Sequence, residues 1–225
     1  MHLGLIGGIG PAATDHYYRG LVRLHADTGK PLELTIAHAD VHEFSRNLTN
    51  NEPKKQAEIF SRLIGRLQAA GARAAAVTSM GGHFCIRELE AISPLPIVNA
   101  IPEVAAEIRK RNLKRVGILG TRTVMESRVY GALPFVDVVL PQGDDLARTH
   151  ESYVAMAITG RVTAEQRRTF HSIGEGLCRN RGAEAIILGG TDLFLAFEGH
   201  DCGFPVIDCA LVHVAALHRK SIGDL

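Results

Sequence analysis

Titratable and hydroxyl side chains follow several short apolar runs of this chain, and acid–base chemistry needs residues of these types. Thr78, Ser79 and His83 come after one apolar run, and Thr191 and Asp192 follow another. A histidine or carboxylate there could exchange a proton if burial shifts its pKa into the working range, whereas a hydroxyl donates hydrogen bonds. A solitary histidine is more often structural, and the chain has 11 of them. Proton transfer is therefore one of two interpretations of these residues.

Two glycine-containing loops are suited to bind an anion. Gly7-Gly8-Ile9-Gly10-Pro11 lies between an apolar run and a helical pattern, so free N–H groups at the helix start could hold a carboxylate or phosphate. A tight structural turn explains the glycines equally well, and their spacing is not that of a dinucleotide fingerprint. Gly120-Thr121-Arg122-Thr123 offers amides and hydroxyls before a helix expected over residues 124–131, with Thr123 as an ordinary N-cap the simpler interpretation.

Metal and disulfide chemistry are not indicated. His38, Asp40 and His42 have the composition of a metal site, but a metal also needs a ligand geometry and supporting partners that a sequence does not show. His150 is a further titratable group near a strand end. The cysteines form no CxxC pair and no zinc-finger spacing; they are Cys85, Cys178, Cys202 and Cys209. We expect no metal.

The composition is that of an ordinary globular protein. The chain has 225 residues, of which 46% are hydrophobic and 22% charged, and its formal net charge is +1. With no basic excess, we expect no nucleic acid or anionic membrane as a partner. No apolar stretch approaches the roughly 18 residues that a membrane span needs, and no signal peptide pattern opens the chain. These features favour a cytoplasmic protein with reduced thiols.

Short apolar runs alternate with longer helical patterns along the whole chain, which is typical of parallel sheets covered by helices. One helix is expected over residues 56–70, where Phe60, Leu63, Ile64 and Leu67 share an apolar face and Gly71 follows as the C′ residue. Strands are expected at residues 2–6, 32–38, 74–78, 97–98, 115–119, 136–140, 185–188 and 206–207.

The order of these elements occurs twice, which predicts two related halves. Gly71-Ala72 before one apolar run is matched by Gly182-Ala183 before another, and Pro96-Ile97-Val98-Asn99 is matched by Pro205-Val206-Ile207-Asp208. We expect an α/β fold with two pseudo-symmetric lobes, each a parallel sheet with helices on both faces, and an active-site cleft between them. The first lobe would comprise residues 1–98 with the C-terminal segment 209–225, and the second residues 99–208.

Three motifs together resemble the aspartate/glutamate racemase family over nearly the whole chain. They are the segment from Gly4 to Thr14 followed by Tyr17-Tyr18, the segment from Gly117 to Thr123 followed by Ser127 and Tyr130, and the segment from Ile187 to Asp192. The resemblance implies a homodimer that acts on a small amino acid or carboxylic acid without a cofactor. It also implies two cysteines on opposite faces of the substrate, one removing the α-proton and the other returning one.

Both of these thiols are absent from this sequence. Thr78 stands where the family has the cysteine of a Cys-Thr-Asn-Thr motif, and Gly190 stands where it has the cysteine of Gly-Cys-Thr-Glu. Met80 replaces the asparagine that would help hold the substrate carboxylate. A threonine hydroxyl ionises far above neutral pH and a glycine has nothing to ionise, so two-thiol racemisation at these positions is excluded.

Three hypotheses remain. In the first, the protein is an enzyme, an isomerase or a lyase or decarboxylase, with His83 or Asp192 supplying proton transfer beside Thr78 and Gly190. Its substrate would be bound by Gly8, Ile9, Gly10, Ser79, Met80, Gly81, Thr121, Thr123 and Thr191. In the second, the racemase scaffold is a non-catalytic carboxylate-binding or regulatory protein. In the third, the protein is a racemase whose base is relocated to Cys85 or Cys209. Cys202 lies in a further loop that could fold over the cleft. A dicarboxylate would need a further cation, for which the candidates are Arg46, Arg122 and Arg148.

Overall fold

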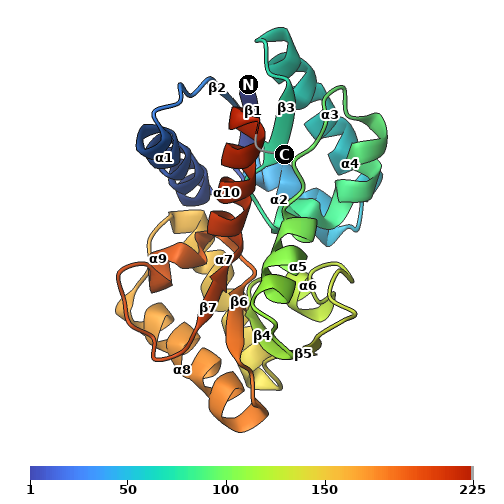
Figure 1. Ribbon diagram of the computed structural model, residues 1–225. Coiled ribbons are helices and arrows are strands. Elements are labelled where there is room, and N and C mark those ends of the chain that lie inside the picture. Colours follow the sequence, from blue (N-terminus) through green and yellow to red (C-terminus); the bar gives the residue numbers. More distant parts are fainter. Residues whose placement is uncertain (224–225) are drawn as a thin grey trace. The chain divides into compact units, whose positions relative to one another are not determined.

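The computed structural model describes residues 1–223 and divides into two compact units (Figure 1). Unit 1 consists of Met1–Ala100 together with the chain from His213 onward, and unit 2 is Ile101–Val212. Residues 224–225, which the sequence interpretation placed in the first lobe, lie outside the described residues. No helix within the described residues is long and apolar enough to cross a membrane.

Unit 1 contains a three-stranded parallel sheet. Its strands are β1 (Leu3–Gly7), β2 (Leu34–His38) and β3 (Ala74–Val77), in the order β2-β1-β3. Its helices are α1 (Pro11–Thr28), α2 (Val41–Thr49), α3 (Pro53–Ala69), the 3-10 helix η1 (Gly81–Cys85), α4 (Ile86–Ile92) and most of α10 (Cys209–Ile222). Every residue of β1 and β3 is buried, as the continuous apolar runs predict for strands covered on both faces.

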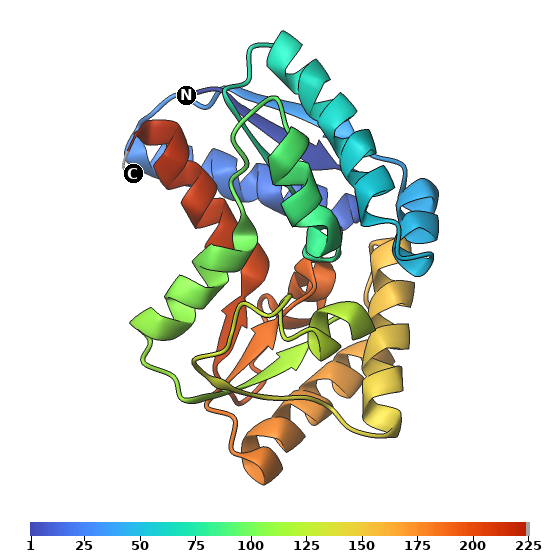
Figure 2. The ribbon, with the colours of Figure 1, turned by 90° about the vertical axis from the view of Figure 1, so that its right-hand side faces the viewer.

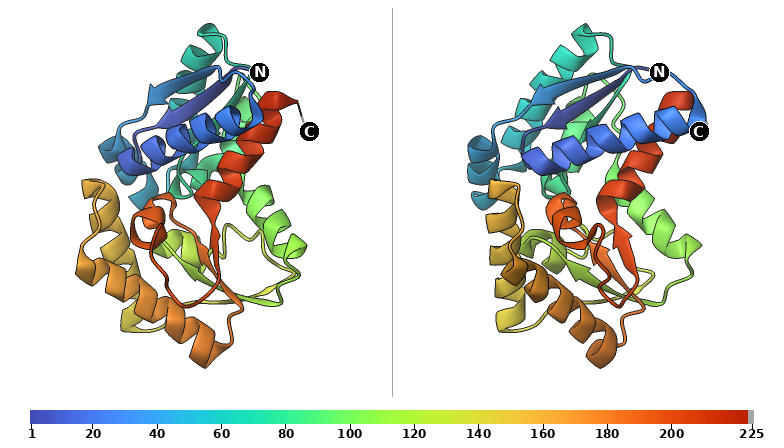
Figure 3. Two further views of the ribbon diagram at one scale, coloured as in Figure 1. Left: turned by 60° about the vertical axis from the view of Figure 1, so that its left-hand side comes forward. Right: turned by 90° about the vertical axis from the view of Figure 1, so that its left-hand side faces the viewer.

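Two glycines of β1 show why helices can approach both faces of this sheet. A Cβ atom at Gly4 would meet Leu67 of α3, whereas one at Gly7 would meet Thr14 of α1. Positions 4 and 7 lie on opposite faces of a strand, so each glycine lets one helix come close. Figure 3 shows α1 lying across one face of the sheet, and Figure 2 shows α3 beside α4.

Unit 2 contains a four-stranded parallel sheet. Its strands are β4 (Arg115–Leu119), β5 (Asp137–Val139), β6 (Ala185–Leu188) and β7 (Val206–Asp208), in the order β5-β4-β6-β7. Its helices are α5 (Ala100–Lys110), α6 (Arg122–Glu126), α7 (Asp144–Thr159), α8 (Ala164–Arg181), the 3-10 helix η2 (Thr191–Leu193) and α9 (Phe194–Phe197). Leu177 of α8 packs against Gly117 of β4, and a buried cluster that includes Phe170, Ile186 and Leu188 fills the space between helix and sheet.

The two sheets share one strand order. In unit 1 the chain after α4 returns beside β3 through the single parallel bridge between Ala75 and Ile97, which occupies the place that β7 has beside β6. The predicted strand at residues 97–98 is thus reduced to one bridge. The predicted α/β fold with two parallel sheets flanked by helices is confirmed.

The predicted helix over residues 124–131 is wrong. Helix α6 begins at Arg122 and ends at Glu126, and the next turn is left-handed, with φ of 50° at Arg128, 56° at Val129 and 57° at Tyr130. Non-glycine residues adopt this conformation uncommonly, and a β-branched valine does so at a steric cost. Val129 is fully buried, and the Ser127 hydroxyl oxygen accepts a hydrogen bond from the Tyr130 amide at 3.0 Å.

Candidate functional site

Thr78 follows β3 directly and lies beside the end of β1. Its side chain is fully buried, and its hydroxyl donates a hydrogen bond to the carbonyl oxygen of Ile6 at 3.1 Å. Its backbone amide donates to the same carbonyl at 3.0 Å, and the Thr14 hydroxyl lies 3.4 Å from the Thr78 hydroxyl. At the first thiol position of the family pattern, the chain therefore has a hydroxyl that ties two strand ends together.

His83 is buried in the turn that follows Thr78, and both of its ring nitrogens are bonded within unit 1. Nδ1 lies 2.7 Å from the carbonyl oxygen of Ser79, so it must carry the proton and donate it, while Nε2 accepts from the amide of Ala100 at 3.3 Å. Burial lowers the pKa of His83 to about 4. The prediction that His83 transfers a proton meets a physical obstacle, because the fold already uses both nitrogens of a neutral ring.

A second buried histidine, His213, lies against His83. Its Nε2 donates to the carbonyl oxygen of Val98 at 2.8 Å, and its Nδ1 accepts from the Tyr17 hydroxyl at 3.0 Å. The two histidine rings meet edge to face with centroids 6.0 Å apart. Burial lowers the pKa of His213 to about 3, and the neighbouring His83 acts in the same direction. This buried polar chain fixes α1 and α10 against the turn that carries Ser79 and His83.

The glycine loop after β1 is shaped by the backbone. Gly8 has φ +96°, and a Cβ atom there would lie 2.5 Å from Nδ1 of His38, so only glycine fits. The amide of Gly8 donates to the Thr14 hydroxyl oxygen at 3.0 Å, and that hydroxyl donates to the carbonyl oxygen of Gly10. Pro11 begins α1, as expected. Of the predicted anion-binding groups, the Gly8 amide is thus already bonded to a side chain.

The other predicted binding residues of unit 1 lie in the turn between β3 and α4. Met80 is fully buried and Ser79 nearly so, and the Ser79 hydroxyl oxygen accepts from the Gly82 amide at 3.3 Å. Gly81 begins η1. The structure brings Ser79, Met80 and Gly81 together with Thr78 and His83 at the carboxyl ends of neighbouring parallel strands.

In unit 2, helix α7 faces both of the loops that were expected to carry chemistry. His150 Nδ1 accepts from the Arg122 amide at 3.2 Å in the loop after β4, and Tyr153, one turn later, contacts the loop after β6. Burial lowers the pKa of His150, and the charge of Arg122 adds to this.

Thr121, and not Thr123, is the N-cap of α6, since its hydroxyl oxygen accepts from the Val124 amide at 3.3 Å. Thr123 is exposed in the first turn of α6.

Gly190 lies against the ring of Tyr153. A Cβ atom at residue 190 would lie 2.5 Å from Cζ of Tyr153 and still closer to Cε2, although the backbone there is extended, with φ −122° and ψ 126°. Any residue can adopt that backbone, so the tyrosine ring alone excludes a side chain. At the second thiol position of the family pattern, the space is therefore filled by a residue from another helix.

Asp192 and Thr191 are both buried in η2, directly after β6. Asp192 is 2% exposed, and its Oδ2 accepts a hydrogen bond from the Tyr153 hydroxyl at 3.2 Å. Burial and the charge of Asp192 raise the pKa of Tyr153 well above its usual value, so the phenol keeps its proton at neutral pH. Unit 2 thus holds a buried carboxylate with a phenol donor at the carboxyl end of its central strands.

The cysteines are poorly placed to act as bases. Cys85 and Cys209 are fully buried; burial, with a smaller effect of Glu88, raises the pKa of Cys85 to about 12, and burial raises that of Cys209 far above its usual value. Both thiols are therefore protonated at neutral pH, against the hypothesis of a relocated thiolate. Cys178 and Cys202 are half-buried.

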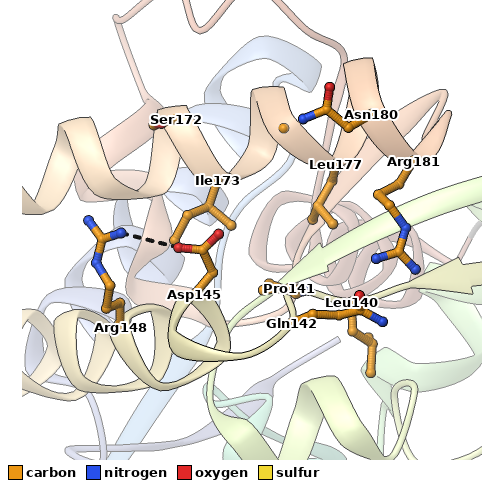
Figure 4. Close-up of a pocket in the computed structure, with 11 residues that line it drawn as sticks. Leu140, Pro141, Gln142, Asp145, Arg148, Ser172, Ile173, Leu177, Asn180 and Arg181 are labelled. Carbon is orange, nitrogen blue, oxygen red and sulfur yellow. Dashed lines mark hydrogen bonds and ion pairs between the residues drawn. The ribbon is translucent and has the colours of Figure 1, made fainter.

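The arginine candidates lie on the surface, two of them in ion pairs. Arg122 pairs with Glu126 and Arg148 with Asp145, each at 3.1 Å, and Arg46 is exposed. Figure 4 shows Arg148 and Asp145 at a pocket of about 220 Å³ formed by the chain after β5 with helices α7 and α8. Neither Gly190 nor Asp192 lines this pocket.

No three metal-binding side chains are grouped to hold an ion within residues 1–223. The suspected cluster of His38, Asp40 and His42 is exposed. Asp40 instead caps α2, accepting from the Glu43 amide at 2.7 Å, and this bond holds the pKa of its carboxyl below the usual range.

The family model for Asp/Glu/Hydantoin racemases matches residues 6–217 of this chain, which takes in both glycine loops, Thr78 and Asp192. The chain belongs to the Asp/Glu/Hydantoin racemase family. Solved structures of the same fold cover nearly the full length of this chain. A protein of Yersinia pestis classed as an Asp/Glu racemase superposes with a TM-score of 0.84 and is 25% identical, with 99% of this chain and 100% of that chain covered.

Two further structures extend this comparison. An aspartate racemase homologue from Pyrococcus horikoshii has a TM-score of 0.80 at 24% identity, covering 98% of this chain and 99% of that one. A glutamate racemase from Francisella tularensis, in complex with D-glutamate, has a TM-score of 0.70 at 14% identity, covering all of this chain and 82% of that one. At these identities the likeness shows that this racemase-family chain has the same fold.

The sequence patterns of this racemase-family chain did not single out Tyr153 as a residue beside Gly190 and Asp192. Tyr153 lies in an amphipathic helix, where an aromatic residue is normally read as part of the core. The available signal was Gly190 itself, because a glycine after a buried strand often marks the close approach of another group.

Proposed function

We propose that this protein binds a small amino acid or carboxylic acid and transfers a proton at its α-carbon without a cofactor, by a mechanism other than the two-thiol one. Membership of the racemase family supports the substrate class. The absence of a thiol at Thr78 and Gly190, with Cys85 and Cys209 buried and protonated, supports a different base. The substrate would be held by the loops that carry Gly8, Ile9, Gly10, Ser79, Met80, Gly81, Thr121, Thr123 and Thr191.

The observation that carries this proposal is the buried Asp192 carboxyl beside Tyr153. As a carboxylate it would accept the α-proton, while the C–H electron pair stays on the α-carbon and is shared with the substrate carboxyl group. The same acid then returns the proton. In a decarboxylase, loss of CO2 would leave that electron pair instead, and Asp192 in its protonated form would supply the only proton required and regain one from water.

Proton transfer from one side follows from the state of Thr78. Its hydroxyl donates a hydrogen bond to the carbonyl oxygen of Ile6, and a threonine hydroxyl ionises far above neutral pH. A single acid–base group returns the proton to the face from which it came. We therefore expect exchange of the α-proton with solvent to be faster than inversion.

The test is deuterium exchange followed by proton NMR on L- and D-aspartate, L- and D-glutamate, L- and D-alanine and substituted malonates, with the purified protein in deuterated buffer. We expect loss of the α-proton signal, or of CO2 from a malonate. Asp192→Asn should abolish the reaction, whereas Asp27→Asn, at an exposed site, should leave it unchanged. A wild-type protein that reacts with none of these acids would contradict the proposal.

A non-catalytic carboxylate-binding protein is the second candidate, and the internal bonds of His83 and Thr78 favour it. A ligand that raises the melting temperature without any exchange or decarboxylation would select this function.

We also propose a homodimer, as the family resemblance implies. Light scattering should then give twice the chain mass of 24.3 kDa.

A further inference from the structure

Tyr153 and Gly190 are complementary in size. The tyrosine ring lies in the space into which a side chain at residue 190 would project, and the extended backbone of Gly190 would otherwise accept any residue. Tyr153 is 7% exposed, so its ring is fixed among neighbours that include Leu188 and Leu193 of the same buried cluster. The position of the Tyr153 ring therefore requires a glycine at residue 190.

The phenol extends from that position to the carboxylate. Cζ, which bears the hydroxyl, is one of the ring atoms nearest to the missing Cβ. That hydroxyl donates to Oδ2 of Asp192 at 3.2 Å. A hydrogen bond to a charged oxygen in a buried site is stronger than one between neutral groups, and it favours the ionised acid.

We propose that Tyr153 is the positioning residue of this site: its ring replaces the side chain missing at residue 190, and its hydroxyl holds the Asp192 carboxylate ionised and in one orientation. The inference rests on the proposed function, in which Asp192 accepts the α-proton. Tyr153 acts through Asp192 and does not itself exchange a proton with the substrate.

Tyr153→Phe separates the two roles, because it keeps the ring against Gly190 and removes only the hydroxyl. In protein labelled with ¹³C at the aspartate carboxyls, the Asp192 signal is identified by its absence in Asp192→Asn. We expect the midpoint of the Asp192 titration to rise by about one pH unit in Tyr153→Phe, as loss of a hydrogen bond to a charged group requires. Tyr18→Phe, at a tyrosine 47% exposed on α1, is the matched control and should leave the midpoint unchanged.

The same variants are then compared in the exchange assay. We expect Tyr153→Phe to lower kcat by about tenfold with little change in KM, because the Asp192 carboxylate, although more basic, is no longer held in one orientation, while the groups that bind the substrate are unchanged. Thermal unfolding confirms that the variant is folded. An Asp192 midpoint identical in Tyr153→Phe and wild type would overturn the positioning role, whatever the activity.

Failure of the proposed function gives a different result. If the wild type exchanges no α-proton but the Asp192 midpoint still shifts in Tyr153→Phe, Tyr153 holds the carboxylate and the assigned reaction is wrong. If the wild type is active and both kcat and the midpoint are unaffected by Tyr153→Phe, the reaction stands and the role of Tyr153 falls.

Discussion

The ring of Tyr153 and the α-carbon of Gly190 are too close for any atom to be added between them: a Cβ atom at residue 190 would lie 2.5 Å from Cζ of the tyrosine. The contact joins α7 to the end of β6 and leaves the backbone of Gly190 unstrained. The tyrosine ring thus occupies the space that a side chain at residue 190 would use.

This contact predicts that Gly190→Ala destabilises the protein by about 1–3 kcal/mol, because the ring and helix α7 must move to admit one methyl group. Chemical denaturation measures the loss. Gly176→Ala is the matched control, since a Cβ atom there meets only Nδ2 of Asn180 at 3.9 Å. Within a helix, that change should be neutral or stabilising. Equal stability of Gly190→Ala and wild type would show that the ring yields without cost.

The neutral buried histidines predict a loss of stability in mild acid. The pKa is about 4 for His83 and about 3 for His213 in the folded protein, both below the unfolded value of 6.5. The unfolded chain therefore binds more protons below about pH 6.5, and the free energy of unfolding falls as the pH drops from there. Each histidine contributes up to about 1.4 kcal/mol per pH unit.

Denaturation at a series of pH values between 7.5 and 4.5 checks this slope. His83→Gln should make it shallower, whereas His200→Gln, at an exposed position, should leave it as in the wild type. A stability that is flat across this range, or that rises toward acid, would contradict the neutral state of the two rings.

The hydroxyl of Thr78 donates a hydrogen bond to the Ile6 carbonyl oxygen, and removing the hydroxyl should lower the free energy of unfolding. Thr78→Val keeps the shape of the side chain but removes the donor to the Ile6 carbonyl, at a cost of about 1 kcal/mol. Thr78→Ser retains the donor and serves as the comparison. If Thr78→Val abolished proton exchange while remaining folded, Thr78 would have a direct catalytic role that its bond to Ile6 does not suggest.

Burial predicts the order in which the four thiols react. Cys178 and Cys202 are half-buried, whereas Cys85 and Cys209 are fully buried and protonated. Alkylation by iodoacetamide at pH 7.5, followed by mass spectrometry of the peptides, should label Cys202 and Cys178 first and the other two only after unfolding. Rapid labelling of Cys85 or Cys209 in the folded protein would restore the hypothesis of a relocated thiolate.

Sequence patterns predicted the sheets well because buried parallel strands are continuous apolar runs. The strands at residues 115–119 and 185–188 have the predicted bounds, and Gly71 follows α3 with φ +96°, as a C′ glycine should. The left-handed turn after α6 could not be predicted, since Arg128 and Val129 have no local preference for it. The left-handed conformation is set instead by tertiary packing, which buries Val129 completely.

The hydrogen bonds of the candidate site residues were less predictable than the elements that carry them. Within each sheet the parallel strands end at a common edge, and buried polar residues follow β3 in unit 1 and β6 in unit 2. Which hydrogen bonds they make depends on residues distant in sequence, such as Ala100 at His83 and Tyr153 at Asp192. Such pairings are set by the fold, and no spacing along the chain encodes them.

The discontinuity of unit 1 has a consequence for the order in which the molecule is made. Unit 2 is one uninterrupted stretch, Ile101–Val212, whereas unit 1 needs residues from His213 onward to supply the partner of Tyr17 and to pack Val214 against Gly20. On the ribosome, where the N-terminal part of a chain emerges first, the half that starts synthesis earlier is completed later. A nascent chain released before residue 213 would hold a complete second half and an unfinished first one.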